Sequence, residues 1–101
     1  MRLSGKKVFQ RIAREGRRVS CGPLSARIIS ADSPRLATAV PRAYGSAVER
    51  NRFRRRVRAA FRQKMADLND MAAVVTPRSG SHAISFGQIE AFMGELAKHG
   101  R

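Results

Sequence analysis

The longest regular pattern of apolar and polar positions begins at Gly45-Ser46 and runs to about Ala66. Within it, apolar residues recur at i, i+4, i+7 and i+8, which places them on one face of an α-helix. These residues are Phe53, Val57, Ala60 and Phe61, and Leu68 would extend the same face. The pattern therefore predicts a long amphipathic helix over residues 46–66 that buries one face.

Two other segments also have helical periodicity. Residues 4–15 form the first, which Ser4 can cap and Gly16 can end. Its apolar positions are Val8, Phe9 and Ile12. The second follows Ser85, which forms a capping-box pattern with Gln88. Its apolar stripe comprises Phe86, Ile89, Phe92 or Met93, and Leu96.

Three short segments have the composition of strands, namely residues 24–30, 35–40 and 72–75. Turn signals bound them, with Gly22-Pro23 before the first and Pro77 after the last. The predicted order is α-β-β-α-β-α, without repeats or linkers. Residues 1–101 are therefore expected to form a single small α+β sandwich domain.

The composition narrows the range of functions. The 101 residues include 21 Lys and Arg against 7 Asp and Glu, a formal net charge of +14, and 43% are hydrophobic. The hydrophobic fraction is too high for a disordered basic tail, and the charge is too unbalanced for an ordinary enzyme acting on a neutral metabolite. A single cysteine cannot form an internal disulfide, and no apolar run is long enough to span a bilayer. Nucleic acid is the first candidate for a partner.

The basic residues are concentrated in one part of the chain. Residues 1–64 contain 18 basic and 3 acidic residues, whereas residues 65–101 contain 3 basic and 4 acidic residues. On the predicted central helix, the face opposite the apolar one carries Asn51, Arg55, Arg58 and Arg62. Arg54 lies at one border of this polar face, and Arg52 and Arg56 lie towards the other.

Between Arg50 and Lys64 there are eight basic residues and no acidic one. Like charges at i,i+4 destabilise a helix by about 0.2–0.5 kcal/mol per pair, and a solvated face usually mixes both signs. A bound polyanion would neutralise this repulsion, and the guanidinium fork grips phosphate with two hydrogen bonds. The helix is therefore predicted to bind RNA or DNA, with a merely solvated basic face as the alternative.

The string GSAVERNRFRRRVRAAFR, residues 45–62, resembles the signature of the bacterial ribonuclease P protein component family. That signature has Gly-x-Ala-Val, one residue, Arg-Asn-Arg, one residue, two basic residues, and an Arg three positions on. Every position is in register here, from Gly45 through Arg50-Asn51-Arg52 to Arg58. Weaker resemblance covers nearly the whole chain, at Leu3, Phe9, Gly16, Asp70 and Pro77.

The resemblance implies an α-β-β-β-α-β-α sandwich of the ribosomal protein S5 domain 2-like fold, with a left-handed crossover. The order predicted from the pattern agrees if a short third strand lies near residues 41–44. The resemblance also implies a bacterial, cytoplasmic protein subunit of ribonuclease P. In that enzyme the catalytic RNA removes the 5′ leader of precursor tRNA using Mg²⁺-type ions. The implied partners are this RNA and precursor tRNA, with no membrane and no obligatory protein partner.

The resemblance assigns contacts with the RNA subunit to Arg50, Asn51, Arg52, Arg55 and Arg58, and the helical pattern adds Arg54 and Arg62. A second surface of the family, a cleft between the first helix and the sheet, holds the single-stranded leader. Phe9 matches its aromatic position and Arg42 one of its basic positions, while Arg27 contributes if its strand turns it into the cleft. Ala13, Ala43 and Thr76 depart from the family pattern, so this cleft is expected to be poorer in stacking and charge than is typical.

The chain offers little for catalysis by its own side chains. His82 lies in a Ser-Gly loop and His99 near the C-terminus, and neither has a second catalytic group nearby in the sequence. Asp67 and Asp70 fit a helix end better than a metal site, and Cys21 has no paired histidine. We therefore expect no catalytic residue and no metal site in this chain, with the Mg²⁺ used by the RNA.

Other interpretations remain open. A structural RNA-binding protein of the ribosomal type would share the charge and the helix without a role in cleavage. A DNA-compacting protein would not need a charge-neutral C-terminal third, and a free-standing nuclease lacks catalytic groups. The Arg-rich residues 1–20 also have the composition of a mitochondrial transit peptide, although a folded amphipathic helix explains the same residues.

Overall fold

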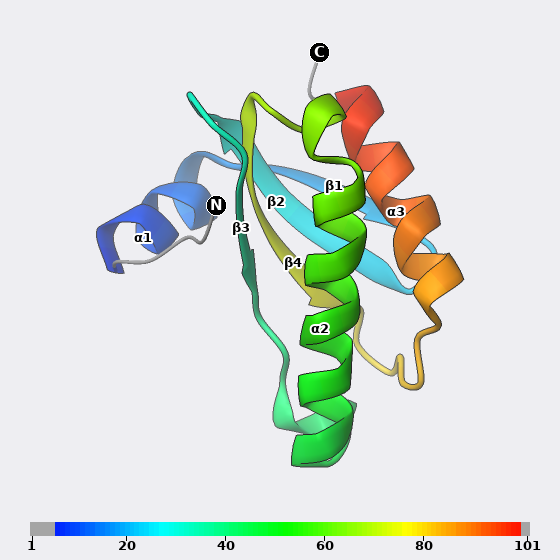
Figure 1. Cartoon of the computed structure of the whole chain (residues 1–101). Coiled ribbons are helices and arrows are strands. Elements are labelled where there is room, and N and C mark those ends of the chain that lie inside the picture. The colour runs from blue at the N-terminus through cyan, green and yellow to red at the C-terminus, as the bar shows by residue number, and fades with distance from the viewer. Residues whose placement is uncertain (1–5, 100–101) are drawn as a thin grey trace.

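A computed structural model describes residues 6–99 of the chain, apart from the side chains of Lys6, Val8 and Phe9. In chain order the elements are α1 (Lys6–Glu15), β1 (Arg17–Cys21), β2 (Leu24–Ser30), β3 (Arg35–Thr38), the 3₁₀ turn η1 (Arg42–Tyr44), α2 (Ala47–Gln63), the 3₁₀ turn η2 (Met65–Asp67), β4 (Met71–Pro77) and α3 (Phe86–His99). They form three layers, with α1 on one side of a four-stranded sheet and α2 and α3 on the other (Figure 1). Among the described residues, none of the helices combines the length and apolar character needed to cross a membrane.

The sheet has the strand order β1-β2-β4-β3. β2 pairs antiparallel with both β1 and β4, whereas β3 pairs parallel with β4. Parallel neighbours need a crossover connection, and here α2 supplies it. The crossover brings Phe53 and Val57 of α2 into the same buried cluster as Val75 of β4.

The extra strand lies at a different place from the one expected. Residues 41–44 form η1, in which the Tyr44 N–H donates to the Pro41 carbonyl oxygen at 3.0 Å. Pro41 has no N–H for a sheet ladder, so it ends the preceding strand. The additional strand is β1, which pairs with β2 through a two-residue turn at Gly22-Pro23, where Gly22 has a φ of 58°. The order α-β-β-β-α-β-α is confirmed, but the third strand near residues 41–44 was wrong.

The other predicted strands are present. β2 has the bounds that the pattern indicated, and β4 is longer than residues 72–75. β3 ends two residues earlier than residues 35–40, although the Ala39 N–H still donates to the Val75 carbonyl oxygen at 3.0 Å. Together these strands carry the sheet that separates α1 from the other two helices.

The central helix α2 begins with a reciprocal cap. The Glu49 N–H donates to Ser46 Oγ at 3.2 Å, and the Ser46 N–H donates to Glu49 Oε1 at 3.1 Å. The helix ends at Gln63 instead of Ala66, and the following turn, η2, still brings Leu68 into the core. The predicted cap of α3 is also confirmed, with hydrogen bonds of 2.9 and 3.1 Å between Ser85 and Gln88. The proposed cap of α1, Ser4, lies outside the described residues.

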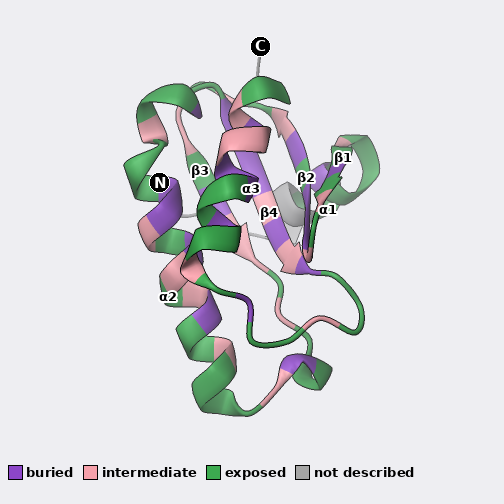
Figure 2. Ribbon diagram, turned by 90° about the vertical axis from the view of Figure 1, so that its right-hand side faces the viewer, coloured by how far each residue is buried: buried purple, intermediate pink, exposed green. Residues whose placement is uncertain are grey.

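The larger core lies between the sheet and the helix pair α2 and α3, whose inward faces are buried and outward faces exposed (Figure 2). Its largest fully buried side chains include Phe53, Phe61 and Phe92. On the other face of the sheet, Ile12 of α1 packs on Ala72 in a much smaller cluster. α1 therefore covers only part of that face, and the rest is available for a ligand.

Candidate nucleic-acid interface

The buried residues of α2 fix the direction of its polar face. Phe53, Val57, Ala60 and Phe61 are buried as predicted. The opposite side consists of exposed residues, namely Asn51, Arg52, Arg55, Arg58 and Arg62. A rigid helix anchored by two phenylalanines thus presents five of the predicted RNA-contacting residues to solvent.

Three other arginines of α2 make hydrogen bonds within the protein. Half-buried Arg50 donates to the Gly45 carbonyl oxygen at 2.8 Å, and Arg56 donates to the Ile84 carbonyl oxygen at 2.9 Å. Arg54 donates to Asn51 Oδ1 at 2.9 Å. In this last bond the amide oxygen of exposed Asn51 is the acceptor, so its side-chain N–H groups can serve as donors to an external acceptor such as a phosphate.

A shallow groove runs along this face of α2 and is lined by Val48, Asn51, Arg54, Arg55 and Arg58. Val48 is 61% exposed, the one large hydrophobic residue with high exposure in the described part of the chain. Apolar contact beside guanidinium groups suits the sugar and base surfaces of RNA as well as its phosphates. The groove therefore combines charge with a small apolar surface.

The single acidic residue of α2, Glu49, lies at the N-terminal end of the helix beside Arg52, and the rest of the arginine face has no acidic residue. The Glu49 carboxylate closes the N-terminal cap, and the backbone N–H and hydroxyl of Ser46 hold its pKa below the usual value of 4.5, with a smaller contribution from Arg52. The ion pairs Arg11–Glu15 and Lys98–Glu95 lie on α1 and α3. The arginines of α2 thus keep their charge for an external partner.

A second candidate surface is the cleft between α1 and the sheet. Its volume is about 440 Å³, and its lining includes Ile12, Ala13, Arg18, Ser25, Arg27, Val74 and Thr76. Arg18 lies directly opposite Arg27, which in turn lies opposite Val74, so all three side chains project on the same face of the sheet. Like charges directly opposite each other destabilise a sheet, and a bound anion would offset this cost.

The predicted leader-binding residues do not all meet in this cleft. Arg27 does point into it, and its guanidinium donates to the Gly16 carbonyl oxygen at 3.3 Å. Arg42 lies in η1 beside α2 and is not among the residues that line the cleft. Phe9 belongs to α1, but its side chain is outside the described part of the structure. Ala13 and Thr76 line the cleft, and Ala43 is exposed in η1.

Comparison with known proteins decides the family. The family model described as Ribonuclease P matches residues 1–100. The chain belongs to the ribonuclease P protein family. The resemblance found in the sequence is thereby confirmed.

Curated relatives in the ribonuclease P protein family support the assignment. The chain is 34% identical over 79 residues to the ribonuclease P protein component of Coprothermobacter proteolyticus, which covers 78% of this chain and 66% of that protein. It is 39% identical over 83 residues to the component of Nitrosococcus oceani, covering 79% and 70% of the two chains. The chain thus spans about two thirds of the length of these relatives.

Solved structures of the family have the same fold. The protein of Thermotoga maritima superposes with a TM-score of 0.82 at 25% identity, covering 98% of this chain and 96% of that one. The protein of Staphylococcus aureus superposes with a TM-score of 0.84 at 23% identity, covering 99% and 94%. The expected fold class is therefore confirmed.

Within this ribonuclease P family fold, Arg18 is a cleft residue that the sequence did not reveal. The pattern left residues 17–20 unassigned, so Arg18 had no strand and no direction. The turn at Gly22-Pro23 was the available signal, because a two-residue hairpin turn needs a strand on both sides. Counting back from the Cys21–Leu24 pair would have placed Arg18 opposite Arg27.

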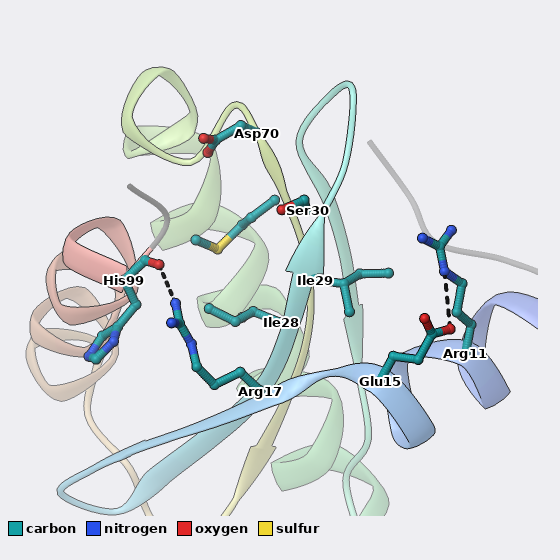
Figure 3. Close-up of a pocket in the computed structure, with 9 residues that line it drawn as sticks. Arg11, Glu15, Arg17, Ile28, Ile29, Ser30, Asp70 and His99 are labelled. Carbon is teal, nitrogen blue, oxygen red and sulfur yellow. Dashed lines mark hydrogen bonds and ion pairs between the residues drawn. The ribbon is translucent and has the colours of Figure 1, made fainter.

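A further hollow at the end of the sheet does not resemble a binding site (Figure 3). Arg11 and Glu15, one turn apart on α1, form an ion pair at one side of it with an N–O distance of 3.4 Å. Arg17 donates to the backbone carbonyl oxygen of His99, which ties β1 to the end of α3. Arg17 thus joins two elements, the Arg11–Glu15 pair lies within α1, and both arginines are engaged inside the protein.

The described residues of this family member contain no cluster of three or more His, Cys, Asp and Glu side chains that could hold a metal ion. His82 is exposed in the loop after β4, and His99 is exposed at the end of α3. Asp70 lies in the turn before β4, where its carbonyl oxygen accepts the Ala31 N–H at 2.9 Å. The expectation that this chain contributes binding surfaces to a ribonuclease P stays a prediction.

Proposed function

We propose that this chain is the protein subunit of a ribonuclease P, where it binds the catalytic RNA and the 5′ leader of precursor tRNA. It assists the Mg²⁺-dependent endonucleolytic removal of the leader, and the RNA performs the chemistry. The observation that carries the proposal is the exposed arginine face of α2 in a chain of this family. The exposed residues of this face would contact the RNA subunit, with Arg50 and Arg54 at its border; they are Asn51, Arg52, Arg55, Arg58 and Arg62.

The cleft between α1 and the sheet supports the second half of the proposal. A single-stranded leader has phosphates for Arg18 and Arg27 and bases that can lie on the small apolar floor near Val74. Phe9 of α1 would add a stacking surface. Because the cleft contains few groups that could read base edges, it suits an enzyme that accepts leaders of many sequences.

The physical contribution of the protein would be electrostatic. The catalytic RNA and precursor tRNA are both polyanions, and their close approach requires counterions. When a protein neutralises Z phosphates, the logarithm of its binding constant falls with the logarithm of the salt concentration with a slope of about −0.7Z to −0.9Z. Its basic side chains take the place of counterions that would otherwise be needed to bring the two RNAs together. The protein should therefore matter most at low Mg²⁺.

The proposal is tested by precursor-tRNA cleavage with a bacterial ribonuclease P RNA at low Mg²⁺, with and without this protein. We expect the protein to stimulate cleavage by the RNA and to cleave nothing alone. Tight RNA binding without stimulation, repeated with the cognate RNA, would instead identify a structural RNA-binding protein. Cleavage by the protein alone would contradict the expectation that this chain has no catalytic residue.

A further inference from the structure

A fourth pocket lies on the opposite flank of α2 from the groove at Val48. Its volume is about 390 Å³, within the range of small-ligand sites. It is bounded by α2, η1 and the loop that leads into α3. Its lining residues are Tyr44, Glu49, Arg52, Phe53, Arg56, Ala83, Ser85 and Phe86.

The wall of this pocket is held in a fixed conformation. The Ile84 N–H donates to the Tyr44 hydroxyl at 3.1 Å, and the Ile84 carbonyl oxygen accepts from Arg56 at 2.9 Å. Tyr44 in turn packs on Phe53 with the ring centroids 5.1 Å apart. Ala83 adopts a φ of 51°, which is unfavourable for a residue with a Cβ and is maintained by these contacts. The pocket is therefore already formed in the free protein.

The chemistry of the pocket suits one nucleotide. Arg52 is exposed at its mouth, and its guanidinium can bind a phosphate. Phe86 is half-buried and gives the pocket an aromatic side chain on which a base can stack. The one acidic group, Glu49, is engaged by the Ser46 N–H in the helix cap. The pocket thus combines a cation from α2, Arg52, with an aromatic ring from the start of α3, Phe86.

We propose that this pocket receives one unpaired nucleotide of the RNA subunit, with its phosphate at Arg52 and its base against Phe86. The inference rests on the proposed function and adds a second contact region to it. The RNA subunit is the occupant because the pocket lies in the α2 and α3 layer, whereas the leader cleft lies on the α1 side of the sheet. The RNA would then contact α2 on both flanks, at the Val48 groove and at this pocket.

Site-specific photo-crosslinking tests the occupant directly. A benzophenone is attached to His82→Cys, which lies next to Ala83 on the pocket wall, in a protein that also carries Cys21→Ser. The matched control carries the same label at Glu90→Cys, on the exposed side of α3. We expect the first position to crosslink to one discrete unpaired nucleotide of the RNA subunit, and the second to give no such product. A crosslink to precursor tRNA, or none at either position, would overturn the proposal.

Substitution of Phe86 tests the stacking contact. Phe86→Leu keeps an apolar side chain but removes the ring, so affinity for the RNA subunit should fall about 5-fold or more. Arg52→Gln should weaken binding and also reduce the salt slope by about 0.7–0.9, whereas Phe86→Leu should leave that slope unchanged. Unchanged affinity in Phe86→Leu, with an unchanged melting temperature, would contradict the pocket. Stimulation of cleavage by the wild-type protein is measured in parallel, so failure of the pocket and failure of the proposed function give different results.

Discussion

The two proposed RNA-binding surfaces are built in opposite ways. The arginine face of α2 belongs to a single helix, and every residue in it follows from the 3.6-residue period and the buried Phe53 and Phe61. The leader cleft is assembled from α1, β1, β2 and β4, and Arg18, Arg27 and Val74 become neighbours only through the sheet register.

Because of this difference, substitutions should affect the binding affinities of the two surfaces in different ways. The face of α2 depends on charge more than on shape, so single substitutions should reduce its affinity in steps. The cleft depends on how closely α1 approaches the sheet, so one backbone change can remove it. Experiments that separate binding of the RNA subunit from binding of the leader should therefore show two independent patterns of sensitivity.

The largest effect is expected from Arg55→Ala combined with Arg58→Ala. Both side chains are exposed on α2, so their loss should leave the fold intact while removing charged hydrogen bonds of about 1.5–3 kcal/mol each. Affinity for the RNA subunit should fall about 10²- to 10⁴-fold, and the log–log salt slope should decrease by about 1.4–1.8. Filter binding at several salt concentrations measures both quantities.

Lys98→Ala is the matched control for this double substitution, because Lys98 is an exposed cation on α3 that pairs with Glu95 at 3.2 Å. It should change neither the affinity nor the salt slope measurably. The arginine pair removes two charges and Lys98→Ala removes one, so a loss of binding free energy half as large in Lys98→Ala would mean that net charge alone, and not the α2 face, determines RNA binding.

The arginine face of α2 and the leader cleft also differ in how far the sequence could predict them. The α2 face was predicted with its buried and exposed sides because one period determines both. The cleft was not, because the direction of Arg27 depends on strand phase and Arg18 had no assigned strand. Arg42 shows the limit of transferring a role by resemblance, since η1 places it beside α2 and outside the lining of the cleft.

Gly16→Ala should disrupt the cleft selectively. A Cβ at this position would lie 2.3 Å from the Ile12 carbonyl oxygen in the last turn of α1 and 3.3 Å from the Cβ of Arg27 on β2, so the end of α1 would have to shift at its junction with the sheet. We expect a loss of about 1–3 kcal/mol in stability, measured by urea unfolding, and weaker binding of leader-bearing precursor tRNA. Affinity for the RNA subunit should stay within about 2-fold, because α2 packs on the other face of the sheet.

Gly94→Ala is the control for Gly16→Ala, since a Cβ at Gly94 in α3 would meet no atom within 4 Å. This substitution should stabilise the protein by up to about 1 kcal/mol through helix propensity alone. If Gly16→Ala were as harmless as Gly94→Ala, the close packing at the end of α1 would not be what maintains the cleft.

Ala13→Phe should strengthen leader binding in the cleft between α1 and the sheet. Ala13 is exposed and lines the cleft, so an aromatic ring there would give the leader a stacking partner worth about 1–3 kcal/mol per base. Affinity for precursor tRNA with a leader should rise about 5-fold or more, whereas affinity for mature tRNA should not change.

Phe9→Ala makes the opposite change, because it removes an aromatic ring from α1. It should weaken binding of the leader-bearing precursor only. Equal effects on precursor and mature tRNA would place the leader elsewhere.

The smallest effect concerns the acidic cap of the basic helix. Because the Ser46 N–H and hydroxyl hold the pKa of Glu49 below its usual value in the folded protein, ionised Glu49 stabilises the fold above that usual value. This stabilisation is lost as the pH falls through the lowered pKa. Glu49→Gln keeps a hydrogen-bonding side chain but cannot ionise, so its melting temperature should lie below that of the wild type near pH 7 and approach it as the pH falls below the usual value of 4.5. A constant difference across this range would mean that the carboxylate charge contributes nothing to the cap.

The same Glu49→Gln variant removes one negative charge beside Arg52. Its affinity for the RNA subunit should therefore rise slightly while leader binding stays unchanged, which again separates the two surfaces.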